Sequence, residues 1–314
     1  MSKVCFGIDV GGTTIKCGLF ETNGNVIDKW EIITRTENGG ENILPDIAAT
    51  VMSKMQLKGY KKEDVAGVGV GIPGPVMAGV VPVAVNLHWG EMNVEYELGK
   101  LLDMKVRAGN DANVAALGEQ WKGGGEGKEN MIMVTLGTGV GGGIIVGGKI
   151  LEGAHGAGGE IGHMQMRDDE TDVCGCGKKG CLEQYASATG IVRMSRRFLA
   201  QSKKESTLRS LSEITSKDIF DAAKAGDEVA LGLVDDLGEM LGKAIAHITA
   251  IVDPEVIVIG GGVSKAGQIL IDVIEKYYRP AAFHACRDTE FKLAVLGNDA
   301  GMYGAVRMVL SDDI

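Results

Sequence analysis

Apolar runs bounded by glycine or aspartate alternate with amphipathic segments along this chain, a pattern typical of α/β proteins. A helix is predicted over residues 41–57, where apolar side chains recur at every fourth position as Ile43, Ile47, Val51 and Met55. A longer helix is predicted from Asp227 to Val252, with one apolar face formed by Val229, Leu233, Leu237, Leu241, Ile245 and Ile248. Residues 298–310 predict a closing helix.

A strand, a glycine turn and a second strand occur in both halves of the chain. Residues 4–10 form an apolar run that ends in a glycine turn, and residues 13–32 predict two strands joined by the hairpin signal Asn23-Gly24. Residues 130–151 repeat the order of strand, glycine turn and strand. We therefore expect two half-molecules of similar build. Further strands are predicted at 65–72 before a Pro/Gly loop, at 105–110 before a helix that begins near Asp111, and at 255–260 before a Gly-rich turn and a helix.

Composition places the chain among globular proteins, with 45% hydrophobic and 24% charged residues. Its 314 residues favour two domains, because single cores stop growing at about 250–300 residues. The net charge is −10 and the basic stretches "SKKES" and "RMSRR" are short, so nucleic-acid binding is not expected. The first residues lack the features of a signal peptide, and no apolar run is long enough to span a membrane. We expect a cytoplasmic protein that does not associate with membranes.

Many of the 48 glycines cluster in turns that follow predicted strands. Glycine lets backbone N–H groups approach an anion such as a polyphosphate, because no Cβ intervenes. The three turns comprise Gly11, Gly12 and Thr13 after Asp9, then Gly137, Thr138 and Gly139, and then Gly260, Gly261 and Gly262. The third turn is predicted to open a helix, where a nucleotide can bind against the helix N-terminus. An ordinary hairpin or left-handed turn is the alternative for each, and none matches the common nucleotide-binding motifs.

Three cysteines and one histidine lie close together in the sequence, namely His163, Cys174, Cys176 and Cys181. A structural disulfide would suit a secreted protein, and the C-x-x-C spacing of redox sites is absent. Three thiolates and one imidazole form a tetrahedral set suited to Zn²⁺ and leave no coordination position open, which predicts a structural zinc site. Free, oxidation-prone thiols are the alternative. Cys5 and Cys17 lie in strand-like runs and are expected in the core.

Five motifs, in this order, resemble those of the ROK family of repressors and sugar kinases: "DVGGTTIK", "GNDANVAALGE", "TLGTGVGGG", "GEIGH" and "CGCGKKGCLE". The bacterial glucokinases are the members that the chain resembles most, and the resemblance extends from Asp9 to the closing helix. It implies an actin-like, ribonuclease-H-like ATPase fold of two α/β domains with the active site in the cleft between them. The implied small domain consists of residues 1–111 and 298–314, and the implied large domain of residues 112–297 contains the zinc loop.

The resemblance also implies the reaction and its residues. The protein would transfer the γ-phosphoryl group of ATP to a sugar hydroxyl, with Asp111 as the base that accepts the hydroxyl proton. The sugar would be bound by Asn110, Asp111, Glu160, His163 and Glu183. Mg²⁺ with ATP would be held by Asp9, the phosphates by the first two glycine turns, and the nucleoside by the turn at Gly260–Gly262. A purely structural role for Glu160 and Glu183 is the alternative.

Asp111 has a competing structural interpretation, because an aspartate at a helix start is commonly an N-cap. The segments "GNDAN" and "GNDAG" are near copies, so Asp299 could be chosen on the same grounds. The family pattern favours Asp111 as the base, and Asp299 is assigned to capping the closing helix.

The substrate is expected to be glucose, phosphorylated on its 6-hydroxyl. Residues 86–89 read Asn-Leu-His-Trp where the family often has Asn-Leu-Gly-Trp, and this departure at His88 leaves the fine specificity open. N-acetylmannosamine, mannose, fructose and allose stay open as substrates. A sugar-sensing regulator without kinase activity is the rival from another class, although the predicted base and phosphate glycines are both present. Self-association into a dimer or tetramer is implied by the resemblance.

Overall fold

The computed structural model describes residues 3–311, which form two compact units. The first unit consists of residues up to 129, 143–159 and those from 295 onward, and the second consists of 130–142 and 160–294. This division by compactness does not coincide with the implied domain boundaries at 111/112 and 297/298, which stay a prediction. Each unit is described by itself below.

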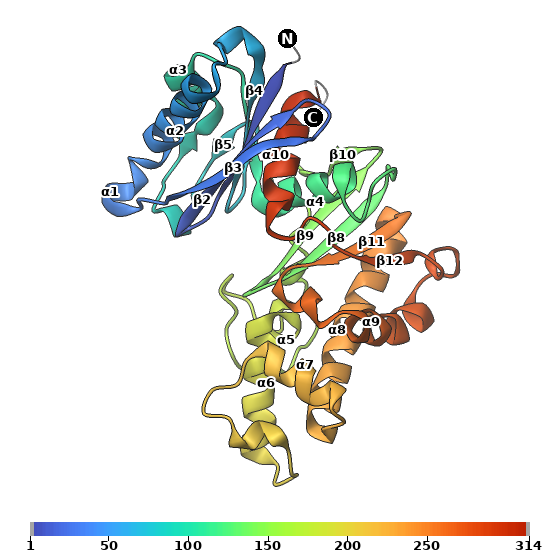
Figure 1. The fold of residues 1–314 in the computed structure, drawn as a ribbon. Helices are drawn as coiled ribbons and strands as arrows, with labels where there is room; N and C mark the ends of the chain where they lie inside the picture. The colour runs from blue at the N-terminus through green and yellow to red at the C-terminus, as the bar shows by residue number, and fades with distance from the viewer. Residues whose placement is uncertain (1–2, 312–314) are drawn as a thin grey trace. The chain divides into compact units, whose positions relative to one another are not determined.

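The first unit is built on a sheet with the strand order β3-β2-β1-β4-β7 (Figure 1). Its strands are β1 (Val4–Val10), β2 (Thr14–Glu21), β3 (Val26–Ile33), β4 (Val65–Ile72) and β7 (Val106–Asn110). β1 pairs with β2 in the antiparallel sense, whereas β1, β4 and β7 run parallel. Asp9 pairs with Gly71 and Ile72 pairs with Asn110, so the carboxyl ends of the three parallel strands lie at one edge of the sheet.

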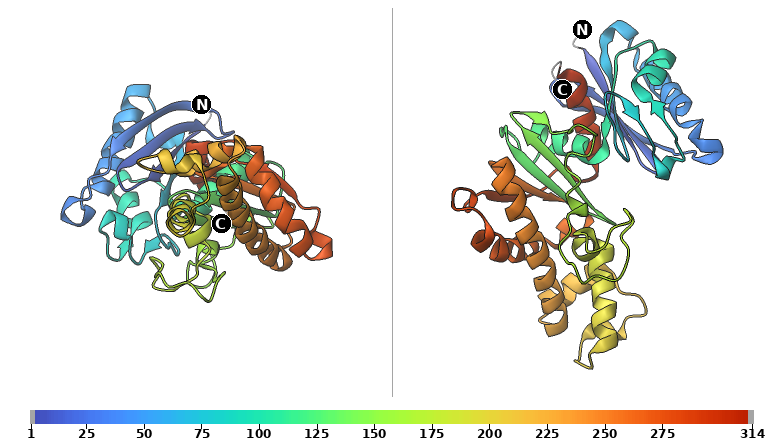
Figure 2. Two further views of the ribbon diagram at one scale, coloured as in Figure 1. Left: turned by 90° about the horizontal axis from the view of Figure 1, so that it is seen from below. Right: turned by 180° about the vertical axis from the view of Figure 1, so that it is seen from behind.

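Helices cover both faces of this sheet. Alternate residues of β1 point to opposite faces, so β1 contributes side chains to the packing on both. Phe6 and Ile8 belong to the core formed with α2 (Ile43–Lys58) and α3 (Val94–Leu102), so the helix predicted at 41–57 is confirmed. Cys5 packs on the other face against Met302 and Val306 of α10 (Ala300–Leu310), the predicted closing helix. Figure 2 shows α10 beside the strands of this sheet.

Several glycines of the first unit permit close packing rather than ligand binding. α4 (Asp111–Lys122) packs against α10, and a Cβ on Gly118 of α4 would lie 2.9 Å from the backbone nitrogen of Gly304. Gly7 of β1 and Gly69 of β4 leave no room for a Cβ beside the backbone of α10. Part of the glycine excess therefore reflects the close approach of α10 to its neighbours. Cys5 and Cys17 are fully buried, as expected.

The second sheet repeats the strand order of the first, as β10-β9-β8-β11-β12. Its strands are β8 (Met131–Leu136), β9 (Val140–Val146), β10 (Lys149–Ile150), β11 (Val256–Gly260) and β12 (Glu290–Leu293). β11 runs parallel to both β8 and β12, and β10 pairs with β9 in the antiparallel sense. In the first sheet, β2 lies on one side of β1, and β4 and β7 lie on the other side. In the second sheet, β9 lies on one side of β8, and β11 and β12 lie on the other side. The predicted similarity of the two half-molecules is therefore confirmed at the level of topology.

The helices of the second unit are α5 (Glu183–Ala186), α6 (Ala188–Gln201), α7 (Ser216–Lys224), α8 (Glu228–Val252) and α9 (Gln268–Ala281). α8 begins where the sequence predicted, because Asp227 caps it by accepting hydrogen bonds from the N–H groups of Val229 and Ala230. The apolar face predicted for this helix is buried. No helix among residues 3–311 combines the length and apolarity that a membrane span requires.

The third glycine turn differs from the prediction in one respect. It does not open the helix directly, because a 3₁₀ segment from Gly262 to Ala266 precedes α9. Gly261 and Gly267, with φ of 82° and 79°, flank this segment, and the second of them separates it from the helix. A short 3₁₀ helix therefore opens at this turn, and the predicted α-helix begins only at Gln268.

Candidate functional site

The first glycine turn follows β1 at the carboxyl edge of the first sheet. The N–H of Gly11 donates to the carbonyl of Thr14 at 3.0 Å, which closes the turn. Thr34 supports it from β3's side, since its hydroxyl donates to the carbonyl of Gly11 at 2.7 Å. Gly12 and Thr13 are left exposed at the tip. The turn is thus fixed from behind and presents its tip to solvent, as a phosphate-binding turn requires.

Asp9 lies at the end of β1, half-buried between Lys16 and the start of α10. Its Oδ2 is 3.8 Å from Nζ of Lys16, and a Cβ on Gly301 would lie 2.7 Å from its Cγ. Burial raises the pKa of Asp9, and the charge of Lys16 offsets part of that rise. The sequence carries no prediction for Lys16, and the β1–β2 register, which pairs it with Asp9, brings the two charges together.

Asn110 and Asp111 occupy the junction of β7 and α4, and only Asn110 is the N-cap of the helix. Asn110 is the N-cap of α4, because its Oδ1 accepts the N–H of Asn113 at 3.1 Å. Its amide also donates to the carbonyl of Gly74 at 3.0 Å. Asp111 is the first helical residue, and its Oδ1 accepts the N–H of Ala112 at 2.8 Å. Capping of the helix is therefore done by Asn110, which removes the N-cap interpretation of Asp111.

Asp299, the counterpart of Asp111 in the repeated motif, behaves differently. It occupies the N-cap position of α10 but makes no capping hydrogen bond. Its carboxylate instead accepts from Nζ of Lys29 at 2.6 Å. The prediction that the Asp299 side chain caps the closing helix is wrong, because the ion pair holds its carboxylate away from the helix N–H groups.

The second and third glycine turns lie side by side at the carboxyl edge of the second sheet. Gly260 of β11 pairs with Thr135 of β8, so the two strands end together. A Cβ on Gly261 would lie 2.5 Å from the carbonyl oxygen of Leu136, which directly precedes the second turn. Ligands of open α/β sheets bind at this edge, beyond the carboxyl ends of the strands. The two turns predicted to bind the nucleotide are thus adjacent.

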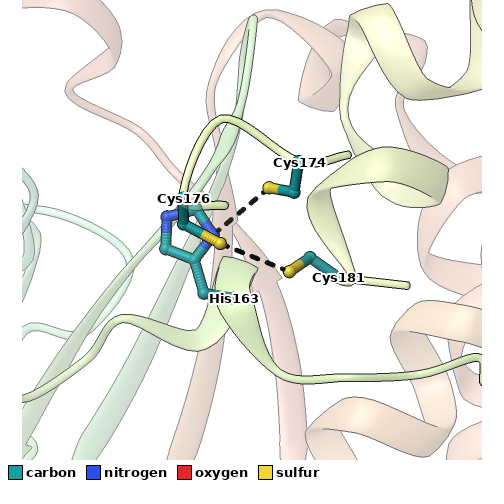
Figure 3. Close-up of side chains that lie close together, drawn as sticks. All are labelled: His163, Cys174, Cys176 and Cys181. Carbon is teal, nitrogen blue, oxygen red and sulfur yellow. Dashed lines mark hydrogen bonds between the residues drawn. The ribbon is translucent and has the colours of Figure 1, made fainter. Parts of the chain in front are cut away.

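Figure 3 shows the three cysteines and the histidine gathered around one point. Their possible ligand atoms all lie within 4.8 Å of one another. Sγ of Cys174 is 3.7 Å from Nδ1 of His163, and the sulfur atoms of Cys176 and Cys181 are 3.6 Å apart. Positive φ angles at Gly177 and Gly180 let the loop turn around this point. The cluster could hold a metal ion with four protein ligands.

The cysteines of this cluster differ in environment. Burial raises the pKa of Cys181 to about 12 and also raises the pKa of Cys174. Cys176 is exposed, and a hydrogen bond from the backbone N–H of Lys178 lowers its pKa. Two of the three thiols therefore need the charge of a cation to deprotonate near neutral pH.

Two carboxylates adjoin the cysteine cluster. Nε2 of His163 is 4.0 Å from Oε2 of exposed Glu160, while Nδ1 of the same ring faces Cys174. Glu183 contacts the second glycine turn, since its Oε2 accepts the N–H of Val140 at 3.1 Å and occupies the space that a Cβ on Gly139 would need. Its other oxygen is 3.8 Å from Sγ of Cys174. Glu183 thus links the cysteine cluster to the turn predicted to bind phosphate.

The structure also contains a polar network that the sequence analysis missed. Glu170, in the loop between His163 and Cys174, is paired with Arg193 and Arg197 of α6. These arginines belong to the stretch "RMSRR", which was interpreted only as a short basic segment. Their partner lies more than 20 residues away, so no local pattern indicates the pairing.

Two sheets with one strand order, each covered by helices and each with glycine turns at its carboxyl edge, define an actin-like ATPase fold. The ROK family model matches residues 5–312, and the chain belongs to this family. It is 43% identical to a glucokinase of Halalkalibacterium halodurans, over 95% of this chain and 92% of that protein. It is 36% identical to a glucokinase of Thermotoga maritima, over 96% of each chain.

A solved structure supports the same assignment. The ROK family glucokinase from Streptomyces griseus, solved in complex with glucose and AMPPNP, is 32% identical to this chain with a TM-score of 0.76. The match covers 97% of this chain and 98% of that one. Kinases for N-acetylated sugars and xylose repressors are found among the more distant relatives.

Proposed function

We propose that this protein is a glucokinase that transfers the γ-phosphoryl group of ATP to the 6-hydroxyl of glucose. The observation that supports it most is the position of Asp111, at a sheet edge, in the first turn of α4 and relieved of capping by Asn110. The full-length similarity to glucokinases of two organisms supports the choice of substrate. The chain is a sugar phosphotransferase of the ROK family.

Asp111 is the group that accepts the proton of the attacking hydroxyl as the phosphoryl group moves. Asn110 fixes the start of α4 and so fixes the carboxylate next to it, while its amide is a sugar ligand. Glu160, His163 and Glu183 bind further sugar hydroxyls. Most of the rate enhancement then comes from positioning and electrostatics, because phosphoryl transfer needs little covalent assistance.

The nucleotide is held by backbone groups and one carboxylate. Gly11, Gly12 and Thr13, together with the turn at Gly137–Gly139, bind the phosphates of ATP, and the turn at Gly260–Gly262 lies against the nucleoside. Asp9 binds Mg²⁺ directly or through water, since the ion retains most of its hydration shell. The pKa of Asp9, raised by burial, falls again when a divalent cation is bound next to it.

The cysteine cluster would hold Zn²⁺, because three sulfur donors and one imidazole nitrogen match the ligand set that this ion prefers. The ion would supply no chemistry to the reaction and would serve only to fix the loop. His163 uses one ring nitrogen in the cluster and directs the other toward Glu160. Residues 160–183 thereby hold their sugar-binding side chains in place.

His88 is the residue most relevant to the choice among sugars. It adopts a left-handed conformation with φ of 58°, where the family's usual glycine has no steric penalty. Its Nδ1 lies 3.0 Å from the carbonyl oxygen of Thr36 and so ties its loop to residues 36–40. N-acetylmannosamine, mannose, fructose and allose are alternative substrates. A sugar-sensing regulator, cytoplasmic location and assembly into a dimer or tetramer remain predictions.

The test is an assay of ADP release with MgATP against glucose, mannose, fructose, allose and the N-acetylhexosamines. We expect glucose to have the highest kcat/KM by at least tenfold, because each buried polar group that a misplaced hydroxyl leaves unpaired costs about 1–3 kcal/mol. Higher kcat/KM for another sugar would correct the substrate. A protein that binds sugars by calorimetry without any turnover would be a regulator.

A further inference from the structure

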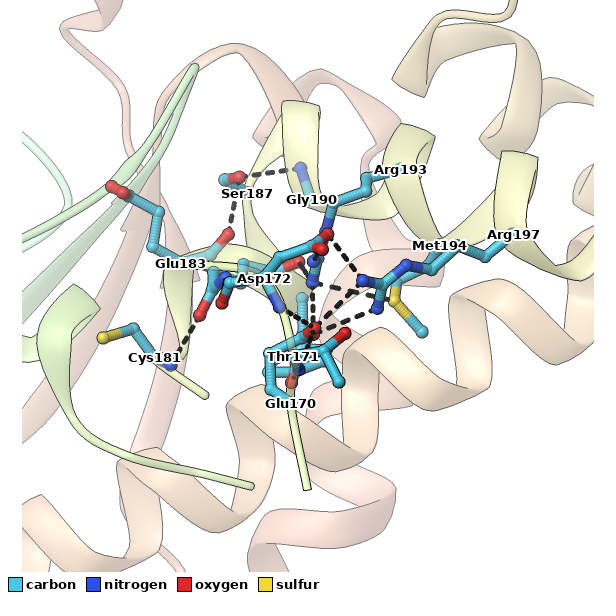
Figure 4. A network of polar contacts seen from close by, with 12 residues as sticks. Glu170, Thr171, Asp172, Cys181, Glu183, Ser187, Gly190, Arg193, Met194 and Arg197 are labelled. Carbon is cyan, nitrogen blue, oxygen red and sulfur yellow. Dashed lines mark hydrogen bonds and ion pairs between the residues drawn. The ribbon is translucent and has the colours of Figure 1, made fainter. Parts of the chain in front are cut away.

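Glu170 is a buried carboxylate in the loop that connects His163 to Cys174 (Figure 4). Its side chain is 2% exposed. It accepts hydrogen bonds from both arginines of α6, from the hydroxyl of Tyr185 at 2.8 Å, and from the backbone N–H groups of Thr171 and Asp172 at 2.9 Å each. Burial alone would raise the pKa of Glu170, but these donors hold the pKa far below its usual range.

The same network extends to α5. Arg193 donates to the carboxylate of Glu170 at 2.9 Å and to the backbone carbonyl of Gln184 at 2.8 Å. The amide of Gln184 donates to the carbonyl of Asp172 at 3.0 Å, and its oxygen accepts the N–H of Cys181 at 3.1 Å. One residue of α5 is therefore bound both to the network and to a cysteine of the cluster.

Glu183 directly precedes Gln184 in α5 and so lies between two anchors. On one side is the cysteine cluster, which contains Cys181 and Cys174. On the other side is the network of Glu170 with the two arginines. Figure 4 shows the Glu183 side chain directed away from the arginines, toward the strands of the second sheet.

Burial of the charges in this network carries a cost in stability. Removing charges from water is costly, and an apolar cluster of similar volume is often as stable. Among residues 3–311, Nε of Arg193 is one of the few buried side-chain polar atoms without a hydrogen-bond partner, which adds to the cost. An ion-pair network does supply fixed directions, because the guanidinium fork and the carboxylate are planar.

We propose that Glu170, together with Arg193 and Arg197, is a positioning group that fixes α5 and thereby holds Glu183 in place, in addition to the metal. The proposal rests on the proposed function of Glu183 as a sugar ligand. The cysteine cluster and the network then hold α5 at two places. Loss of either set of contacts leaves α5 attached at the other place but free to shift.

Glu170→Gln tests the proposal, because it keeps the shape of the side chain and removes its charge. We expect KM for glucose to rise about tenfold while kcat changes less than about twofold, since a binding group has moved and the base has not. Hydrogen exchange of the backbone amides of 183–190 should accelerate, and zinc should be released faster to a chelator. Both of these measurements are independent of activity.

Arg197→Lys is the conservative companion variant, which keeps the charge but loses the two-point contact. We expect it to change KM for glucose, hydrogen exchange at 183–190 and zinc release in the same direction, but by less. Asp221→Asn is the matched control, because it breaks an exposed ion pair with Lys217 on α7 of the same unit. We expect wild-type values for it throughout.

The outcomes separate the proposal from its rivals. A lower melting temperature with unchanged exchange at 183–190 and unchanged KM for glucose would show a merely stabilising network and overturn the proposal. If the wild-type protein phosphorylates no sugar, the proposed function fails, and exchange and zinc release still decide whether Glu170 positions α5. Unchanged exchange and zinc release in both Glu170→Gln and Arg197→Lys would overturn the proposal in either case.

Discussion

The two sheets have the same strand order, but the candidate site residues at their carboxyl edges are positioned in different ways. At the first edge, Asp9 and Asp111 lie at the junctions of strands with their turns and helices, so regular structure positions them directly. At the second edge, Glu183 begins the four-residue helix α5, next to the cysteine cluster and the ion-pair network of Glu170. Side chains at the ends of long regular elements need few supporting contacts, whereas a side chain on a short segment between loops depends on fixed anchors.

Removal of the metal should have the largest effect on sugar binding, and it should change only the carboxyl edge of the second sheet. Structural Zn²⁺ binding contributes about 10–16 kcal/mol in small zinc domains, so its loss releases the loop. Chelation, or Cys176→Ser at the exposed ligand, is expected to abolish glucose binding and to accelerate hydrogen exchange over residues 163–190. Exchange in β7 and α4 should stay the same. Equal protection of the loop with and without the metal would contradict this expectation.

The first unit has a buried carboxylate of its own, which offers a comparison with Glu170. Glu119 is fully buried and accepts the N–H groups of Gly124 and Leu296 at 2.8 Å and of Val295 at 3.1 Å. Glu119→Gln replaces one acceptor oxygen with a donor and leaves backbone donors unpaired. We expect the free energy of unfolding to fall by about 2–3 kcal/mol. Denaturant titration measures it, and a loss below 0.5 kcal/mol would disprove the assigned role.

The glycine turns should respond unequally to alanine. A Cβ on Gly139 meets the carboxylate of Glu183, whereas the nearest atom to a Cβ on Gly12 is 3.7 Å away. Gly139→Ala is expected to lower the free energy of unfolding by about 1–3 kcal/mol and to raise KM for both glucose and ATP, because it disturbs Glu183 and the second glycine turn together. Gly12→Ala should leave stability within about 0.5 kcal/mol and should raise only KM for ATP. Equal stability losses would indicate that the two turns are packed alike.

The smallest effect is expected at Asp9 and concerns pH. Because the pKa of Asp9 is raised by folding, the folded protein binds its proton more readily than the unfolded chain does. Its contribution to stability is therefore present at low pH and is lost as the pH rises through the raised pKa, from about pH 4 upward. Asp9→Asn should remove this decline in nucleotide-free protein. Glu170 should act in the opposite sense, because its pKa is lowered by folding.

The fold was largely predictable from local patterns. The four-residue spacing from Ile43 to Met55 predicted α2, and the apolar face from Val229 to Ile248 predicted α8, because each pattern lies within the helix that it specifies. The repeated strand and glycine turn predicted two similar sheets. The 3₁₀ segment before α9 was missed, since a glycine pattern does not determine which φ each glycine adopts.

The candidate site was predictable as a set of residues but not as a set of contacts. The cysteine cluster follows from residue type and proximity in sequence, and the structure brings its four members together. The pairing of Glu170 with Arg197 and of Lys29 with Asp299 depends on tertiary structure, which local patterns do not contain. Gly7 and Gly69 illustrate the same limit, because only the approach of α10 shows why they lack side chains.

The central claim is that Asp111 is the catalytic base and that its sequence counterpart Asp299 is not. The most direct test compares kcat for glucose phosphorylation in Asp111→Asn and Asp299→Asn, with glucose binding measured by calorimetry. We expect kcat to fall by about 10²–10⁴ in the first variant with binding largely kept, and to stay within about twofold in the second. Comparable kcat values in the wild type and Asp111→Asn would contradict the account.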